Sequence, residues 1–92
     1  MNFVFYGTDK PDHLDVRVST RDAHIEWLKS QPIVLAGPRL DEKGDMMGSM
    51  VVCEAKDLAA AQALFATDPY AEAGLFASTE ISAWKWVIGA PE

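Results

Sequence analysis

Cysteine is almost absent from this chain, and long apolar runs are absent altogether. The 92 residues include a single cysteine, Cys53, so no disulfide can form within the chain. No stretch approaches the roughly 20 apolar residues that a membrane helix needs, and the first ten residues lack the basic start and long apolar core of a secretory signal. We therefore expect a cytoplasmic protein without a membrane partner.

Basic residues are scarce as well. Eight Lys and Arg stand against 14 Asp and Glu, and the net charge is −6, so nucleic acid and anionic membranes are poor partners and small molecules or proteins are better ones. No metal is expected, because His13 and His24 lie eleven residues apart and no second cysteine exists. The glycine-rich loops that hold nucleotides are missing too, and we expect no cofactor.

The rest of the composition is that of a globular protein. Apolar residues make up 49% of the chain and charged residues 24%, a composition that favours a folded chain over a disordered one. A chain of this length is too short for several cores, and we expect one domain over residues 1–92. Cys53 follows Val51 and Val52 in an apolar run, which favours a buried small side chain over a reactive thiol.

The hydrophobic pattern predicts six elements. Strands are expected at residues 2–7, 33–37, 47–55 and 75–88, and helices at residues 12–30 and 58–66. Asp57 is a suitable N-cap for the second helix, and Pro69 ends it. The order β-α-β-β-α-β predicts an α+β fold of the ferredoxin-like type, in which two helices cover one face of a four-stranded antiparallel sheet.

Two helices leave the second face of this sheet uncovered. The first and last predicted strands are apolar at both parities; in the last, Phe76, Trp84 and Trp86 share one parity while Ile81 and Val87 lie on the other. An uncovered face with this composition would expose a large apolar patch to water. We therefore expect a homodimer that associates through the helix-free sheet face.

The first predicted helix carries polar residues beside its apolar stripe. On a helical wheel, with roughly 100° per residue, four apolar residues fall in one sector that should face the sheet: Leu14, Val18, Ile25 and Leu28. Arg21 falls inside this sector and Arg17 and His24 border it, so all three are expected to point toward the packed side. Arg21 is either a structural arginine paired with a carboxylate or a ligand-binding residue, and His24 by itself is typical of a satisfied boundary histidine.

Asp68 precedes Pro69 just after the second predicted helix, where a turn residue is the simplest interpretation. In the predicted fold the two helices run side by side, which would bring Asp68 close to His24. A carboxylate that accepts a hydrogen bond from Nδ1 would fix the imidazole tautomer and leave Nε2 free as a general base or acid. The predicted loop at residues 38–48 is either a plain connection or a flexible rim over a pocket.

Short motifs along nearly the whole chain resemble the YciI-like (YCII-related) family of dimeric ferredoxin-like, or dimeric α+β barrel, proteins. They are R-x-x-H at residues 21–24, A-G-P at 36–38, D-x-x-G at 41–44, G-S at 48–49, D-P-Y at 68–70 and A-G-L at 73–75. The resemblance implies an active site built on a histidine and an aspartate, here His24 and Asp68. The residues that it places beside them, as candidates for substrate binding, are Arg17, Arg21, Ser49 and Tyr70.

The resemblance leaves three functions open. The first is a cofactor-independent lyase or isomerase that acts on a small oxygenated ring or keto acid, with His24 moving protons and Arg21 holding an oxyanion; halide elimination from chlorinated hydroxyquinols is associated with the family. The second is a module that senses or carries a small acidic metabolite without turnover. In the third, His24 and Asp68 only stabilise an accessory dimer. We expect the first.

Overall fold

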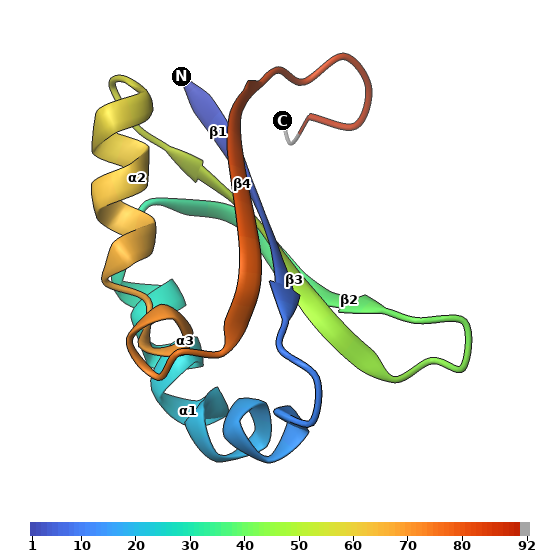
Figure 1. The fold of residues 1–92 in the computed structure, drawn as a ribbon. Helices are drawn as coiled ribbons and strands as arrows, with labels where there is room; N and C mark the ends of the chain where they lie inside the picture. Colours follow the sequence, from blue (N-terminus) through green and yellow to red (C-terminus); the bar gives the residue numbers. More distant parts are fainter. Residues whose placement is uncertain (91–92) are drawn as a thin grey trace.

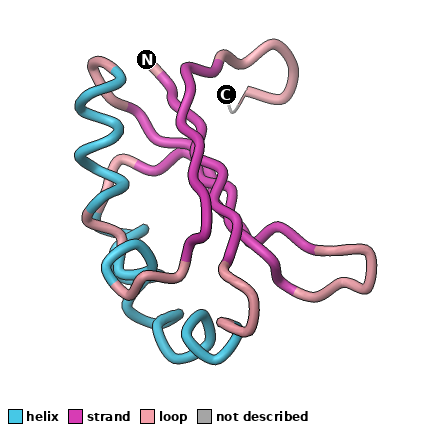
Figure 2. The backbone as a smooth tube through the Cα atoms, in the orientation of Figure 1, coloured by secondary structure: helices cyan, strands magenta, loops and turns pink. Residues whose placement is uncertain are grey.

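The structure, a computed structural model, describes residues 1–90. Its elements in chain order are β1 (Asn2–Asp9), α1 (Leu14–Ser30), β2 (Ile33–Leu40), β3 (Met46–Glu54), α2 (Leu58–Ala66), α3 (Pro69–Glu72) and β4 (Phe76–Trp84). The strands form one antiparallel sheet in the order β2-β3-β1-β4, and the helices lie on one side of it (Figures 1 and 2). The predicted ferredoxin-like α+β fold is confirmed.

Several element boundaries differ from the prediction. Helix α1 begins at Leu14 rather than at residue 12, because Asp12 has φ 60, a left-handed conformation that a right-handed helix cannot include. Strand β4 ends at Trp84, four residues before the predicted end. The short helix α3 was not predicted at all; Pro69 occupies its first turn, where a proline needs no backbone N–H partner.

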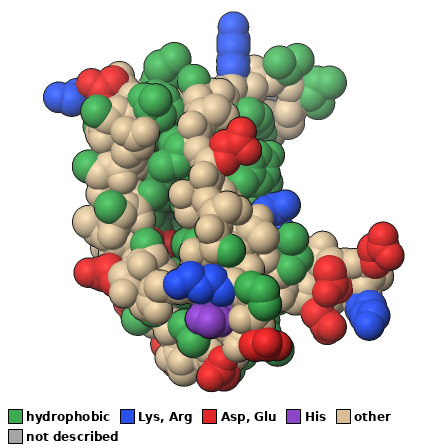
Figure 3. All heavy atoms as spheres, in the orientation of Figure 1, with side chains coloured by type: hydrophobic (Ala, Val, Ile, Leu, Met, Phe, Trp, Pro, Cys, Tyr) green, Lys and Arg blue, Asp and Glu red, His purple; other side chains and the backbone are tan. Residues whose placement is uncertain are grey.

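The predicted loop at residues 38–48 is mostly strand. Strands β2 and β3 pair from Ile33↔Cys53 to Leu40↔Met46, and only the tip of the hairpin turns. The Asp41 carboxylate accepts hydrogen bonds from the backbone N–H groups of Lys43 and Asp45, at 2.8 and 3.1 Å, and so orders this turn. The tip projects from the body and carries the charged side chains at the right of Figure 3.

The core lies between the sheet and the helices. Phe3 and Phe5 of β1 and Cys53 of β3 face it from the sheet, and Trp27 of α1 and Phe65 of α2 close it from the other side. Cys53 is fully buried, which confirms the interpretation as a small core side chain. The rings of Phe5 and Phe65 stack with centroids 4.9 Å apart, so α2 is held directly onto β1.

The buried face of α1 matches the prediction only in part: Arg17 and His24 lie on the packed side as expected, and Ile25 and Leu28 are half-buried. Leu14 and Val18 are 53% and 59% exposed, whereas the buried residues of this helix are Arg17, His24 and Trp27. Arg21, which was expected on the packed side, is exposed. The prediction failed for Leu14, Val18 and Arg21 because it centred the buried face on the apolar residues. The face is instead centred nearer Arg17 and His24, whose partners lie elsewhere in the chain.

A β-bulge changes the parity of β4. Thr8 pairs with Ser78 but Asp9 pairs with Phe76, so residue 77 is extra and Phe76 turns to the core side together with Ile81. The predicted grouping of Phe76 with Trp84 is therefore wrong. Gly7 makes this arrangement possible, because a Cβ on residue 7 would lie 2.7 Å from the Phe76 ring.

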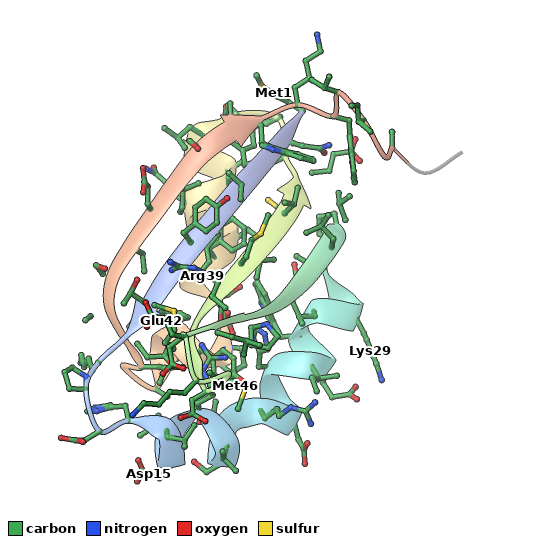
Figure 4. All side chains as sticks on the ribbon, turned by 90° about the vertical axis from the view of Figure 1, so that its right-hand side faces the viewer. Met1, Asp15, Lys29, Arg39, Glu42 and Met46 are labelled. Carbon is green, nitrogen blue, oxygen red and sulfur yellow. The ribbon has the colours of Figure 1, made fainter. Side chains whose placement is uncertain are left out.

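The helix-free face of the sheet is mixed in character. Tyr6 is 39% exposed, and the Arg39 guanidinium lies 5.5 Å from its ring centroid and donates to the Gly7 carbonyl at 3.2 Å. Figure 4 shows Arg39 lying across the sheet on the side away from α2. Trp84 and Trp86 contact each other edge to face, with centroids 4.8 Å apart. Within residues 1–90, no helix is long and apolar enough to cross a membrane.

Candidate active site

A buried histidine and aspartate meet where α1 passes the start of α3. His24 Nδ1 lies 2.7 Å from Asp68 Oδ1, as predicted. The same carboxylate oxygen accepts the Tyr70 backbone N–H at 3.0 Å, because Asp68 is the N-cap of α3. Asp68 is only 2% exposed. An ionised carboxylate accepts and cannot donate, so Nδ1 carries the proton and the imidazole tautomer is fixed.

Two aromatic rings lie nearly parallel to the imidazole of His24. The Tyr70 ring stacks on it with centroids 4.0 Å apart and an interplanar angle of 20°. The Trp27 ring lies 6.1 Å away at 23°, and its Nε1 donates to Thr67 Oγ1 at 2.8 Å. These contacts, together with the hydrogen bond to Asp68, restrict rotation of the imidazole.

Arg17 forms a second buried network beside the first. Its Nε and Nη2 donate to the two Asp9 carboxylate oxygens at 2.7 and 2.8 Å, and Nη2 also donates to Ser49 Oγ at 2.8 Å. Burial alone would lower the pKa of Arg17, but the hydrogen bonds and negative charge of Asp9 raise it above its ordinary value. The guanidinium carbon lies 4.7 Å from the Tyr70 ring centroid, so both networks touch the same aromatic ring.

A cavity of about 240 Å³ opens between α1 and the β2–β3 hairpin. Its polar wall consists of Arg17, Arg21, His24, Ser49 and Tyr70. Its remaining wall is formed by Ile25, Leu28, Ala36, Gly37, Pro38 and Met46. Pro38 and Met46 belong to the segment predicted as a loop, and they line the cavity from paired strands rather than from a mobile rim. Asp68 is not part of the wall and lies behind the imidazole.

His24 lines this cavity, and its second ring nitrogen, Nε2, is accessible. Nε2 makes no hydrogen bond to any side chain or backbone group in residues 1–90. In that part of the chain, every fully buried side-chain nitrogen or oxygen has a hydrogen-bond partner. Because Nε2 has no partner, it must be accessible. Beside it, burial raises the pKa of the Tyr70 phenol, an effect that the positive charge of Arg17 offsets only in part. Tyr70 therefore stays protonated and can donate a hydrogen bond to a ligand.

The sequence reasoning missed Asp9, the partner of Arg17. Asp9 lies beyond the first predicted strand, which was expected to end at residue 7, and a single sequence carries no signal that a carboxylate eight residues before an arginine pairs with it. Trp27 and Thr67 were missed for the same reason, because their hydrogen bond links two helices. In the described part of the chain, no three His, Cys, Asp or Glu side chains are grouped so that they could hold a metal ion.

Fold and cavity together define a ferredoxin-like α+β protein with a candidate small-molecule site. The sequence model of the YCII-related domain matches residues 1–85, and the chain belongs to this family. Protein YciI of Escherichia coli is 34% identical over 98 aligned residues, which cover 96% of this chain and all of that protein. An uncharacterized protein of Haemophilus influenzae is 31% identical over the same shares of the two chains.

Solved structures agree with this family assignment. The 5-chloro-2-hydroxyhydroquinone dehydrochlorinase TftG of Burkholderia phenoliruptrix, in complex with 2,5-dihydroxybenzoquinone, superposes with a TM-score of 0.83 at 34% identity, covering 92% of this chain and 94% of that one. An antibiotic biosynthesis monooxygenase gives a TM-score of 0.59 at 16% identity, over 94% of this chain and 97% of that one. The second similarity concerns the fold alone.

Proposed function

We propose that this protein is a cofactor-independent enzyme of the lyase or isomerase type that transfers protons on a small oxygenated ring or keto acid. One observation carries the proposal: His24 is held through Nδ1 by a buried carboxylate, while the residue lines a cavity and its Nε2 is accessible. An imidazole oriented in this way can accept a proton from a ligand at Nε2, and Asp68 stabilises the imidazolium that results. General base catalysis of this kind contributes about 10² to 10⁴-fold in rate.

The cavity wall supports charge development on a ligand oxygen. Removal of a proton from a hydroxyl or an acidic carbon leaves a phenolate or enolate. The Arg17 guanidinium and the protonated Tyr70 phenol lie on the same wall as His24, and Arg21 lies at its exposed side. Hydrogen-bond donors that are fixed before the reaction stabilise such an oxyanion without reorganising. We assign ligand binding to Arg17, Arg21, Ser49 and Tyr70, and stabilisation of the oxyanion to Arg21 with the Tyr70 phenol as a second donor.

A balanced elimination fits this set of groups. The relative TftG is a dehydrochlorinase of a chlorinated hydroxyhydroquinone. For a ring of that class, a proton moves from a hydroxyl oxygen to the halogen-bearing carbon, the halide then leaves that carbon, and a second hydroxyl loses its proton. The net loss is one proton and one halide ion, and the quinol becomes a quinone without an external oxidant. His24 would carry the protons in each step.

Solvent deuterium exchange tests this proposal directly. We expect the protein to catalyse exchange at an acidic carbon, or halide release, for at least one member of a panel of hydroxyquinols, lactones and small keto acids. His24→Ala should lower the rate by about 10² to 10⁴-fold with ligand binding largely kept, and Asp68→Asn should give a milder loss. Lys29→Gln, on the exposed face of the same helix, is the matched control and should not change the rate.

The alternative is a sensor or carrier that binds the same ligands without turnover. Asp68 would then serve only as the N-cap of α3 and as a partner of His24, two structural roles that it already has. Binding without exchange in both wild type and His24→Ala would establish this alternative.

We also propose that a single domain spans the chain and that it forms a homodimer through the helix-free sheet face. An exposed Tyr6, with Arg39 and Glu80 in the same shallow groove, offers a surface that a second copy could pair with under two-fold symmetry. Light scattering should give about twice the monomer mass of 10.1 kDa. A monomer at micromolar concentration would contradict the dimer and would leave the site within one chain intact.

A further inference from the structure

The two arginines on the cavity wall differ in whether their charge is balanced. Arg17 is 2% exposed, and its guanidinium gives two charge-assisted hydrogen bonds to Asp9. Arg21 lines the same cavity but is exposed, and it makes no hydrogen bond or ion pair to another residue in the range 1–90. The positive charge of Arg17 is therefore cancelled within the protein, whereas that of Arg21 is free to meet a ligand.

The third basic group on the wall is balanced in the same way. Any positive charge that His24 acquires is offset by Asp68, 2.7 Å away. The Arg17–Asp9 pair is neutral, and the His24–Asp68 pair is neutral when the imidazole is protonated and carries one negative charge when it is not. Neither pair offers a net positive charge to a ligand, so Arg21 is the one cation on the described wall without a carboxylate of its own. A ligand with one negative charge can pair with Arg21. A second negative charge on the same ligand would lie near Asp9 and Asp68 with no cation left to oppose it, and like charges repel more strongly in a cavity than in bulk water.

We propose that Asp9, by neutralising Arg17, restricts the ligand of this cavity to a single negative charge, so that the site selects small monoanionic ring compounds and rejects dianions. Asp9 is thus a specificity-determining residue that acts through Arg17 without touching the ligand. The apolar side chains of Leu28, Pro38 and Met46 supply the surface that covers the ring. The proposal rests on the proposed function only in requiring that the same cavity binds the ligand.

Two pairs of probes, each matched in shape and differing by one charge, test the selection by titration calorimetry at pH 7. Benzamide and benzoate carry zero and one negative charge; 4-carbamoylbenzoate and terephthalate carry one and two. For the wild type we expect benzoate to bind at least about tenfold more tightly than benzamide, and 4-carbamoylbenzoate at least about tenfold more tightly than terephthalate, each a difference of about 1.4 kcal/mol. Equal affinities within the second pair, or no binding of any probe, would overturn the proposal.

Three variants identify the groups responsible. Asp9→Asn keeps the side-chain shape but removes the charge that cancels Arg17, and it should reverse the second preference so that terephthalate binds more tightly. Arg21→Gln should abolish the preference for benzoate over benzamide, and Lys29→Gln, which removes a charge from the exposed face of the same helix, should change neither ratio.

Loss of one partner of a buried ion pair is destabilising, and Asp9→Asn is therefore assayed only if it folds by circular dichroism. If it does not fold, Asp9→Glu, which keeps the negative charge, is assayed in its place: it should keep both wild-type preferences, and a preference for terephthalate in this variant would overturn the role of Asp9. A uniform loss of affinity for all four probes in Asp9→Asn would show a merely structural role. The two proposals fail on different results. If the protein catalyses deuterium exchange but does not select by charge, the role of Asp9 is wrong. If it selects by charge but catalyses no exchange, the proposed catalysis is wrong.

Discussion

Three glycines allow the packing around the site to be tested by the same substitution, alanine, at positions with different surroundings. Gly48 immediately precedes Ser49, the partner of Arg17, and a Cβ on residue 48 would overlap the backbone carbonyl oxygen of Gly7 on the neighbouring strand. A Cβ on Gly7 would instead meet the Phe76 ring at 2.7 Å. A Cβ on Gly37 would have nothing within 4 Å.

The obstructing atoms determine the expected cost. A backbone carbonyl in a paired strand cannot move without separating β1 from β3, and we expect Gly48→Ala to lower the free energy of unfolding by more than about 3 kcal/mol, above the usual range for overpacking. The Phe76 ring can rotate or shift, so Gly7→Ala should cost about 1–3 kcal/mol. Gly37→Ala has no steric cost and should gain up to about 1 kcal/mol, because it reduces the freedom of the unfolded chain.

Urea denaturation followed by circular dichroism gives these differences directly. For a domain of this size, 1 kcal/mol corresponds to a shift of about 4–8 °C in Tm, so thermal scans should rank the variants in the same order. The expected order of stability is Gly37→Ala, wild type, Gly7→Ala and Gly48→Ala. A Gly48→Ala protein as stable as the wild type would refute the close approach of β3 to β1 beside the Arg17 network.

Three further predictions concern the helices and the buried acids. Trp27→Phe removes the donor to Thr67 Oγ1 and should cost about 1 kcal/mol of unfolding free energy in urea titrations. Val18→Ser should change that free energy by less than about 0.5 kcal/mol, because Val18 is exposed. A large loss would indicate that Val18 packs against the sheet, as the apolar stripe predicted from the sequence requires. Burial raises the pKa of the Cys53 thiol and the Tyr70 phenol above their ordinary values of 9.0 and 10.0. The unfolded chain therefore releases these protons at a lower pH than the folded chain does. Their contribution to stability is complete below pH 9.0 and is lost as the pH rises through the pKa values of the folded state. Unfolding free energy measured against pH should therefore decline above pH 9.0, and in Cys53→Ala the decline should begin nearer pH 10.0.

The fold was predictable because its signals are local. The strands are marked by alternating or continuous apolar residues. Asp57 caps α2 as expected and accepts a hydrogen bond from the Ala60 backbone N–H at 2.8 Å, and Pro69 follows the end of that helix. The bulge that turns Phe76 toward the core was not predictable, since it depends on the register between β1 and β4 and not on the residues of β4 alone. The same applies to the hairpin, whose length is set by pairing across Leu40 and Met46.

The approach of His24 to Asp68 was predictable from the topology, because the two helices of a split βαβ unit lie side by side. The roles of these residues remain a prediction that the proposed experiments test. The pairing of Asp9 with Arg17 was not predictable. Arg17 was expected to face inward, but which carboxylate pairs with a buried arginine is seen only in the folded chain.

The failure of the amphipathic pattern on α1 itself points to the site. A helix that packs on a sheet normally buries apolar residues, and α1 does so at Trp27, but at Arg17 and His24 it buries a cation and an imidazole. Each is costly to bury, and each is matched by a carboxylate at 2.7 Å, the half-buried Asp9 for Arg17 and the buried Asp68 for His24. Apolar residues at both positions would pack with less cost and would leave no open Nε2 beside a cavity. Departures from a local rule that are compensated this fully are concentrated at functional sites, and here both departures face the same 240 Å³ cavity.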